Sequence, residues 1–167
     1  MAVAPFLEAA LGRPSPHTPV WFMRQAGRSL PEYRALRGEG SILDAIKRPD
    51  LAAELTLQPV RRYGVDAAVL FSDIVVPAHA VGFGIDVAPG TGPMCTHPLR
   101  TAADLARLRP FTAEADAPYV GETVRQLAAE LPVEVPLLAF AGAPFTVASY
   151  LIEGRPSKNY VNTKRMM

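Results

Sequence analysis

The sequence predicts an α/β protein with a parallel sheet, either doubly wound or closed into a barrel. Two observations lead to this fold class: three short, continuous apolar runs, and the helical patterns that lie between them. Apolar runs that do not alternate with polar residues are typical of strands buried on both faces, as in parallel sheets. Because strands and helices alternate along the chain, the strands are expected to pair in parallel through helical crossovers.

The three expected strands are Pro19 to Met23, Ala67 to Phe71 and Val135 to Phe140. Between the first two, a helix is expected to begin at Pro49, to run through Arg62, and to end at Gly64. Pro59 lies inside this stretch and is expected to kink or interrupt the helix, because proline lacks the backbone N–H that a helix interior needs.

Three further segments separate the second and third strands. The Gly- and Pro-rich stretch from Gly82 to Pro98 predicts an excursion such as a short hairpin. Thr101, with Asp104 three residues later, is typical of a helix N-terminus, and Tyr119 to Leu131 is expected to form the long helix before the third strand.

The C-terminal residues predict that the chain is incomplete. Ser157 to Met167 begins like a helix, with Ser157 as a candidate cap, and carries no signal that ends a helix. Three to four βα units cannot close a barrel of eight, which takes about 250 residues. Residues 1–167 are therefore expected to form a single domain that is truncated at its C-terminus.

Composition narrows the range of partners. Seventeen basic and sixteen acidic residues give a formal charge of +1, so no global field is expected to attract nucleic acid or an anionic membrane. The first twelve residues do not resemble a secretory signal, and no apolar run reaches the roughly eighteen residues that a membrane span needs. A cytoplasmic protein is expected. Cys95, as the one cysteine, excludes an internal disulfide and is expected to be a small loop or core residue.

The first candidate site directly follows the first expected strand. Arg24 and Arg28 are separated by Gln25, Ala26 and Gly27. Ligands bind at the carboxyl ends of strands in α/β sheets and barrels, and paired guanidinium groups suit carboxylates. Arg37 continues the basic series and is included among the candidate substrate-binding residues. A solvated loop with surface ion pairs is the alternative interpretation.

Two more candidates follow the other expected strands. Asp73 comes after the second strand, where its carboxylate could accept N–H groups or stabilise a developing cation, or could instead cap a helix at Ile74 to Val81. Gly142 to Thr146 follows the third strand and leads into a helix with Tyr150, which could face a ligand or pack in the core. His17, His79 and His97 are scattered, so no metal site is expected.

Four separated blocks closely resemble the uroporphyrinogen decarboxylase family. They are Pro19-Val20-Trp21-Phe22-Met23-Arg24-Gln25-Ala26-Gly27-Arg28 with Leu30-Pro31-Glu32-Tyr33-Arg34, Glu54-Leu55-Thr56-Leu57-Gln58-Pro59, Asp66-Ala67-Ala68-Val69-Leu70-Phe71-Ser72-Asp73-Ile74, and Gly142-Ala143-Pro144-Phe145-Thr146 with Tyr150 and Glu153-Gly154.

The resemblance implies a (β/α)₈ TIM barrel, of which this chain would hold roughly the first three to four βα units. It implies a homodimeric enzyme without metal or organic cofactor, which removes four acetate carboxyls from uroporphyrinogen to give coproporphyrinogen in heme biosynthesis. On this basis Arg24 to Arg28 would bind substrate carboxylates, Asp73 would lie near the pyrrole N–H groups, and Tyr150 would contribute to the same pocket.

The sequence departs from the family pattern in two ways. Ser29 stands where family members commonly carry Tyr, and the chain ends before the family's later serine and C-terminal histidine. Two alternatives therefore remain open: a non-catalytic fragment that binds a porphyrinogen or a full-length subunit, and a cobalamin-linked methyltransferase of the same superfamily. The 167-residue chain alone is expected to be inactive.

Overall fold

The computed structural model describes residues 4–21, 29–88 and 90–167, which fall into two compact units. The first unit is drawn from residues 1–39, 45–71 and 119–140. The second is drawn from residues 40–44, 72–118 and 141–167. The chain passes from the first unit to the second shortly after each of two parallel strands. Both strands therefore belong to the first unit, and the segments that follow them belong to the second.

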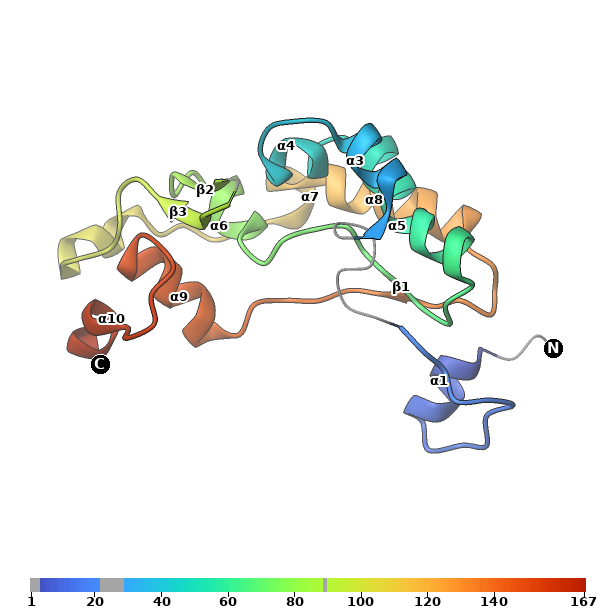
Figure 1. Cartoon of the computed structure of the whole chain (residues 1–167). Helices are drawn as coiled ribbons and strands as arrows, with labels where there is room; N and C mark the ends of the chain where they lie inside the picture. Colours follow the sequence, from blue (N-terminus) through green and yellow to red (C-terminus); the bar gives the residue numbers. More distant parts are fainter. Residues whose placement is uncertain (1–3, 22–28, 89) are drawn as a thin grey trace. The chain divides into compact units, whose positions relative to one another are not determined.

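A pair of short parallel strands forms the sheet of the first unit, and Figure 1 labels the first of them. In this sheet β1 (Ala68–Val69) pairs with β4 (Leu137–Leu138), with Ala68 opposite Leu137. The Leu70 N–H extends the ladder by donating to the Leu138 carbonyl at 3.0 Å. Two of the three predicted strands and their parallel pairing are thus confirmed, although each is shorter than the apolar run that predicted it.

The first predicted strand is not confirmed. Pro19, Val20 and Trp21 do not form a strand, and the rest of that run lies outside the described residues. The segment nevertheless runs beside the start of β1, because the Asp66 N–H donates to the Val20 carbonyl at 3.1 Å. One backbone hydrogen bond fixes the position of the segment without making a ladder.

Two helices cover the strand pair of the first unit. Helix α5 (Pro49–Tyr63) and helix α8 (Pro118–Glu130) bury a shared cluster of Ala53, Leu57, Leu70 and Leu127. The predicted bounds of α5 are confirmed, since it begins at Pro49 and ends at Gly64, whose φ of 60° is left-handed. The expected interruption at Pro59 is wrong, because the helix continues through it.

Three shorter helices precede α5 in the part of the chain that the structure describes: α1 (Pro5–Ala10), α3 (Pro31–Arg37) and α4 (Ile42–Ile46). In the first unit, Tyr33 of α3 meets Phe71 edge to face, with ring centroids 6.1 Å apart. These rings pack against the buried side chains of Ala45, Leu51 and Leu55, and so attach α3 to the start of α5.

The second unit is built on a hairpin and on helix α9. Strand β2 (Ile85–Ala88) pairs antiparallel with β3 (Gly92–Cys95), which confirms the predicted excursion. Helix α9 (Pro144–Glu153) lies against β3, because the Cys95 N–H donates to the Gly154 carbonyl at 2.8 Å. The remaining elements of this unit are α6 (Val76–Ala80), the 3₁₀ helix η1 (Ala102–Arg107), α7 (Ala113–Asp116) and α10 (Val161–Met166).

Capping residues predicted one helix start correctly and one incorrectly. Thr101 does precede a helix, and the Asp104 carboxylate accepts its backbone N–H at 2.8 Å as predicted, although the helix is 3₁₀. Ser157 does not cap the last helix, which begins only at Val161. Its hydroxyl oxygen instead accepts the Tyr160 N–H at 3.0 Å, within a turn that brings Tyr160 to a left-handed φ of 51°.

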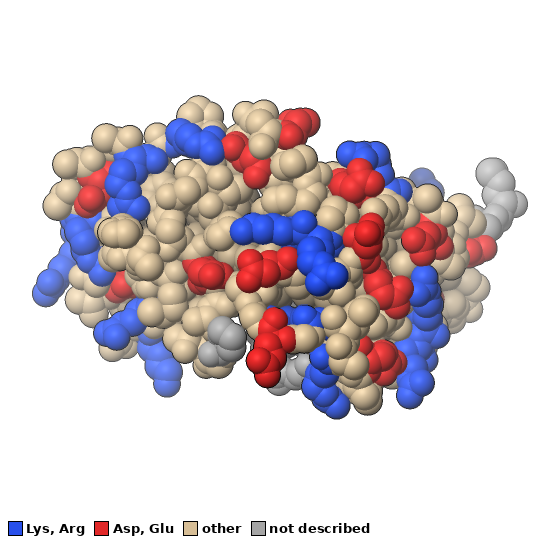
Figure 2. All heavy atoms as spheres, turned by 90° about the horizontal axis from the view of Figure 1, so that it is seen from above, with Lys and Arg blue, Asp and Glu red and all other residues tan. Residues whose placement is uncertain are grey.

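Charged side chains of both signs are interspersed on the face seen in Figure 2. This distribution agrees with the formal charge of +1. A search of the described residues found no helix both long enough and apolar enough to span a membrane.

Candidate active site

The predicted site residues fall into three groups in the structure. Arg24, Gln25, Ala26, Gly27 and Arg28 lie outside the described residues. Arg37 is the last residue of α3 in the first unit, where its guanidinium donates to the Gly38 carbonyl at 3.1 Å. Asp73 and Tyr150 both belong to the second unit. A common rim for the arginines and Asp73 therefore stays a prediction.

Asp73 follows β1 in the chain and turns the backbone into α6. Its Oδ1 accepts the Val75 N–H at 2.9 Å, and its carbonyl accepts the Val76 N–H at 3.2 Å. The alternative in which Asp73 is the helix cap is not confirmed. The side chain does bind a backbone N–H at the start of a helix, but it stands two residues before the N-cap residue Val75, and α6 is shorter than the predicted Ile74 to Val81.

The surroundings of Asp73 disfavour its negative charge. Burial raises the pKa of the Asp73 carboxyl above its ordinary value, and the hydrogen bond from Val75 opposes this rise. Oδ2 has no hydrogen-bond partner among the residues that the structure describes. A half-buried carboxylate with a vacant oxygen is suited to accept N–H groups from a ligand, since it gains more from such donors than a hydrated carboxylate does.

The segments that follow the two parallel strands meet in the second unit. A Cβ atom added at Gly142 would lie 3.1 Å from the Cβ of Ile74 and would clash with a methyl group of Val147. Glycine is needed here for close packing rather than for its conformational freedom. The loop after β4 is thereby held against the residue next to Asp73, which joins two of the family-like blocks in space.

Tyr150 lies on α9, which the same loop opens. The helix starts at Pro144, and the buried hydroxyl of Ser149 donates to the Thr146 carbonyl at 2.8 Å. The Tyr150 side chain is half-buried, and within the described part of the chain its hydroxyl makes no hydrogen bond. A ligand in this unit could therefore bond to the hydroxyl without displacing an internal partner.

The cysteine and two of the three histidines considered in the sequence have partners or positions that belong to the protein's own packing. Cys95 is buried at 6% exposure, which confirms it as a core residue. His79 bonds to the Ile85 carbonyl at 2.7 Å, and His97 lies 3.1 Å from the Thr96 hydroxyl. In the described ranges no group of three or more His, Cys, Asp or Glu side chains is arranged to hold a metal ion.

The pairing between His17 and Asp66 in the first unit was not predicted from the sequence. His17 Nε2 lies 2.7 Å from Asp66 Oδ1, and the other carboxylate oxygen accepts the Val20 N–H at 2.7 Å. The bond from Val20, with a smaller contribution from His17, holds the pKa of Asp66 below its ordinary value. Asp66 thus anchors the segment that leads toward Arg24.

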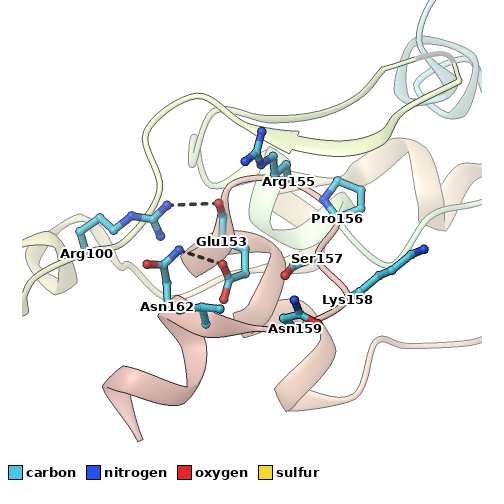
Figure 3. A pocket seen from close by; sticks show the side chains of 9 residues that line it. Arg100, Glu153, Arg155, Pro156, Ser157, Lys158, Asn159 and Asn162 are labelled. Atoms are coloured by element: carbon cyan, nitrogen blue, oxygen red, sulfur yellow. Dashed lines mark hydrogen bonds between the residues drawn. The ribbon is translucent and has the colours of Figure 1, made fainter.

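Sequence reasoning also missed a pocket of about 570 Å³ in the second unit, shown in Figure 3. Its lining comes from a residue two positions before η1 and from the end of α9 into α10: Arg100, Glu153, Arg155, Pro156, Ser157, Lys158, Asn159, Val161 and Asn162. The basic residues that follow Glu153 in the sequence were the available signal for this pocket. Arg100 could not be grouped with them from the sequence, because it lies far away in the chain.

The sequence model of the uroporphyrinogen decarboxylase family matches residues 1–167, the whole of the chain. The chain belongs to the uroporphyrinogen decarboxylase family. Among curated relatives named uroporphyrinogen decarboxylase, that of Salinispora tropica is 60% identical over 99% of this chain. That of Streptomyces griseus is 60% identical over 97%, and that of a Nocardioides species is 58% identical over 100%.

This chain spans about half the length of these relatives, namely 44% for Salinispora and Streptomyces and 48% for Nocardioides. A solved methyltransferase from Methanosarcina mazei has a similar fold, with a TM-score of 0.56 and 24% sequence identity. The match covers 89% of this chain and 44% of that structure. At this identity the likeness concerns the fold alone. Three of the predicted site residues have surroundings that this structure describes: Arg37 in the first unit, and Asp73 and Tyr150 in the second.

Proposed function

We propose that the protein to which this chain belongs decarboxylates the four acetate side chains of uroporphyrinogen to give coproporphyrinogen in heme biosynthesis. Identity of 58–60% to relatives of that name, over almost the whole chain, supports this reaction. The structural observation that carries the proposal is Asp73, a half-buried carboxylate with one oxygen bound to Val75 and the other vacant among the described residues.

The chemistry gives Asp73 a definite role. A pyrrole acetate loses CO₂ when its ring has been protonated, because the electron pair of the breaking carbon–carbon bond then flows into a cationic ring. A carboxylate beside the pyrrole N–H groups stabilises that cation as it forms. We assign this role to Asp73, whose charge is poorly solvated before substrate binds.

Other candidate residues would hold the substrate. We propose that the arginine segment from Arg24 to Arg28 binds substrate carboxylates through guanidinium groups, with Arg37 adding to the positive field. Tyr150 would complete the pocket through its hydroxyl. The proposed reaction requires no metal and no organic cofactor, and we leave the proton donor unassigned.

We further propose that residues 1–167 form the first three to four βα units of a single (β/α)₈ barrel domain whose remainder follows Met167. The parallel pairing of β1 with β4 and the half-length match to relatives support this arrangement.

Family membership also supports a cytoplasmic homodimer. Light scattering on the full-length protein should give twice the monomer mass.

The direct test is to follow the conversion of uroporphyrinogen by the full-length protein under anaerobic conditions. Coproporphyrinogen should form with metal chelators present and without added cofactor. Formation of no decarboxylated product, or methyl transfer from methylcobalamin instead, would contradict the proposal. The isolated 167-residue chain, assayed in parallel, should be inactive because it lacks the remainder of the barrel.

A further inference from the structure

The pocket at the end of α9 combines positive charge with hydrogen-bond donors. Arg100, Arg155 and Lys158 supply three cations and Glu153 supplies one carboxylate, so the lining carries a net charge of two positive. The volume of about 570 Å³ lies within the usual range for small-molecule sites, about 300–1,000 Å³. The lining therefore favours an anion carrying more than one negative charge.

The one carboxylate of the pocket is already engaged within the protein. Glu153 Oε1 accepts the Thr163 N–H at 2.8 Å and the Thr163 hydroxyl at 2.9 Å. Its Oε2 accepts the side-chain amide of Asn162 at 2.8 Å, as Figure 3 shows. These donors lower the pKa of Glu153, with the Thr163 N–H contributing most. Glu153 thus joins α9 to α10 as an ionised carboxylate whose two oxygens are already bound within the protein.

The C-terminal end of a helix normally repels anions, because its last carbonyls point outward. Here several of these carbonyls have donors. The Tyr150 carbonyl accepts the Gly154 N–H at 3.0 Å, and the Leu151 carbonyl accepts the Leu99 N–H at 2.9 Å. The Glu153 carbonyl accepts the guanidinium of Arg100 at 3.1 Å. These bonds reduce the repulsion and also fix Arg100 at the pocket.

Two cations of the pocket are not bound to any other described residue. Arg155 and Lys158 are exposed on the loop between α9 and α10, and neither makes an ion pair or hydrogen bond within the described part of the chain. In Figure 3, Lys158 extends outward from the loop, where its four-carbon stem leaves the ammonium free to turn toward a ligand. Both charges are available for an anion without breaking an internal contact.

The pocket is distinct from the surroundings of Asp73. The Gly142 loop and Ile74 lie at the N-terminal end of α9, whereas Glu153 and the pocket lie at its C-terminal end. A helix of ten residues is about 15 Å long. Neither Asp73 nor Tyr150 lines the pocket.

We propose that this pocket is a second anion site, which binds a small phosphate-type polyanion through Arg155, Lys158 and Arg100. Guanidinium forks match phosphate oxygens bidentately, and the lysine adds a point charge. An anion there would hold the loop between α9 and α10 against the hairpin side of the unit. The site does not depend on the decarboxylation reaction.

The test is a calorimetric titration of the full-length protein with pyrophosphate, in a phosphate-free buffer of low ionic strength. Wild-type protein should bind pyrophosphate with defined stoichiometry. The double variant Arg155→Gln/Lys158→Gln should bind about tenfold more weakly or worse, because two charged contacts are lost. The charge-retaining variant Arg155→Lys/Lys158→Arg should lose less affinity than the Gln variant.

The control removes two charges from the neighbouring helix instead. Lys164 and Arg165 are exposed on α10 and do not line the pocket, so Lys164→Gln/Arg165→Gln should bind pyrophosphate almost as wild type does. Equal weakening in both double variants would show a general charge effect and overturn the site. So would absent binding, or binding that survives in Arg155→Gln/Lys158→Gln, which would place the anion elsewhere. Because these variants leave Asp73 intact, coproporphyrinogen formation measured alongside tests the proposed reaction separately.

Discussion

The carboxylate of Asp73 accepts the backbone N–H of Val75 at 2.9 Å while burial raises its pKa. The hydrogen bond positions the side chain, and the burial makes its negative charge costly. Burial thus disfavours the charge of Asp73 in the folded protein, whereas the proposed reaction uses that charge. The relationship separates two properties, stability and catalysis, that substitution of Asp73 should change in opposite directions.

Asp73→Asn should leave the protein at least as stable as wild type at pH 7. The amide oxygen can still accept the Val75 N–H, and the buried charge is gone. The pKa of Asp73 in the folded protein lies above its ordinary value of 3.8. Wild-type stability should therefore fall as pH rises from 3.8 through the folded pKa. Thermal melts at pH 7 and near pH 4 should show the variant's advantage shrinking at the lower pH. A marked loss of stability in the variant at pH 7 would contradict this account.

Gly142→Ala should destabilise the protein by about 1–3 kcal/mol, the usual cost of overpacking a filled site. The added methyl group meets Ile74 and Val147. Gly121 offers a matched control within α8, where an added Cβ meets nothing within 4 Å. Gly121→Ala should stabilise by about 0.5–1 kcal/mol, because alanine favours helices. Urea unfolding of both variants measures the contrast, and an equal effect of the two substitutions would rule out the packing at Gly142.

Asp66→Ala should lower the free energy of unfolding at pH 7 by about 1–3 kcal/mol, because the Val20 N–H and His17 lose their acceptor. The folded pKa of Asp66 is depressed, so its contribution is present above 3.8 and is lost as pH falls through the folded pKa. The deficit of the variant should therefore disappear at strongly acid pH.

A control for Asp66 is the exposed Asp44, for which Asp44→Ala should change stability by no more than about 0.5 kcal/mol. If the deficit of Asp66→Ala were the same at pH 7 and at acid pH, the charge of Asp66 would not be its cause. Urea titrations across that pH range provide the measurement.

Arg28→Lys in the full-length protein should raise KM for uroporphyrinogen by about tenfold, since lysine keeps the charge but loses the bidentate fork. Arg24→Lys should act similarly. Arg62→Lys is a suitable control, because among the described residues Arg62 makes only a long surface contact of 3.9 Å with Glu32. Steady-state kinetics measure the effect, and an unchanged KM in both Arg24 and Arg28 variants would remove the arginine segment from the proposed substrate site.

The sequence predicted those parts of the fold that local signals determine. Proline at the start and glycine at the end gave the bounds of α5, and Gly and Pro clusters gave the β2–β3 hairpin. The predicted cap at Ser157 was wrong because the Ser157 hydroxyl accepts the Tyr160 N–H in a turn before the helix. Tyr160 has a left-handed backbone in this turn. Strand lengths were overestimated because a strand ends where its ladder partner ends, and an apolar run does not reveal its partner.

The candidate site was predictable only in part. Asp73 and the Gly142 loop were found because they follow strands, and the structure adds that Gly142 packs on Ile74. The bond between Asp66 and His17, and the bond from Arg100 to the Glu153 carbonyl, join residues distant in sequence. Such contacts depend on tertiary packing, so no spacing rule predicts them.

The most direct test of the central claim is kcat for coproporphyrinogen formation by the full-length protein carrying Asp73→Asn. Asp104→Asn serves as the control, because Asp104 also accepts backbone N–H groups but lies in the cap of η1. Asp73→Asn should lower kcat by about 100-fold or more, as loss of a group that stabilises transition-state charge does, while Asp104→Asn retains near wild-type kcat. Wild-type kcat in a folded Asp73→Asn protein would contradict the role assigned to Asp73.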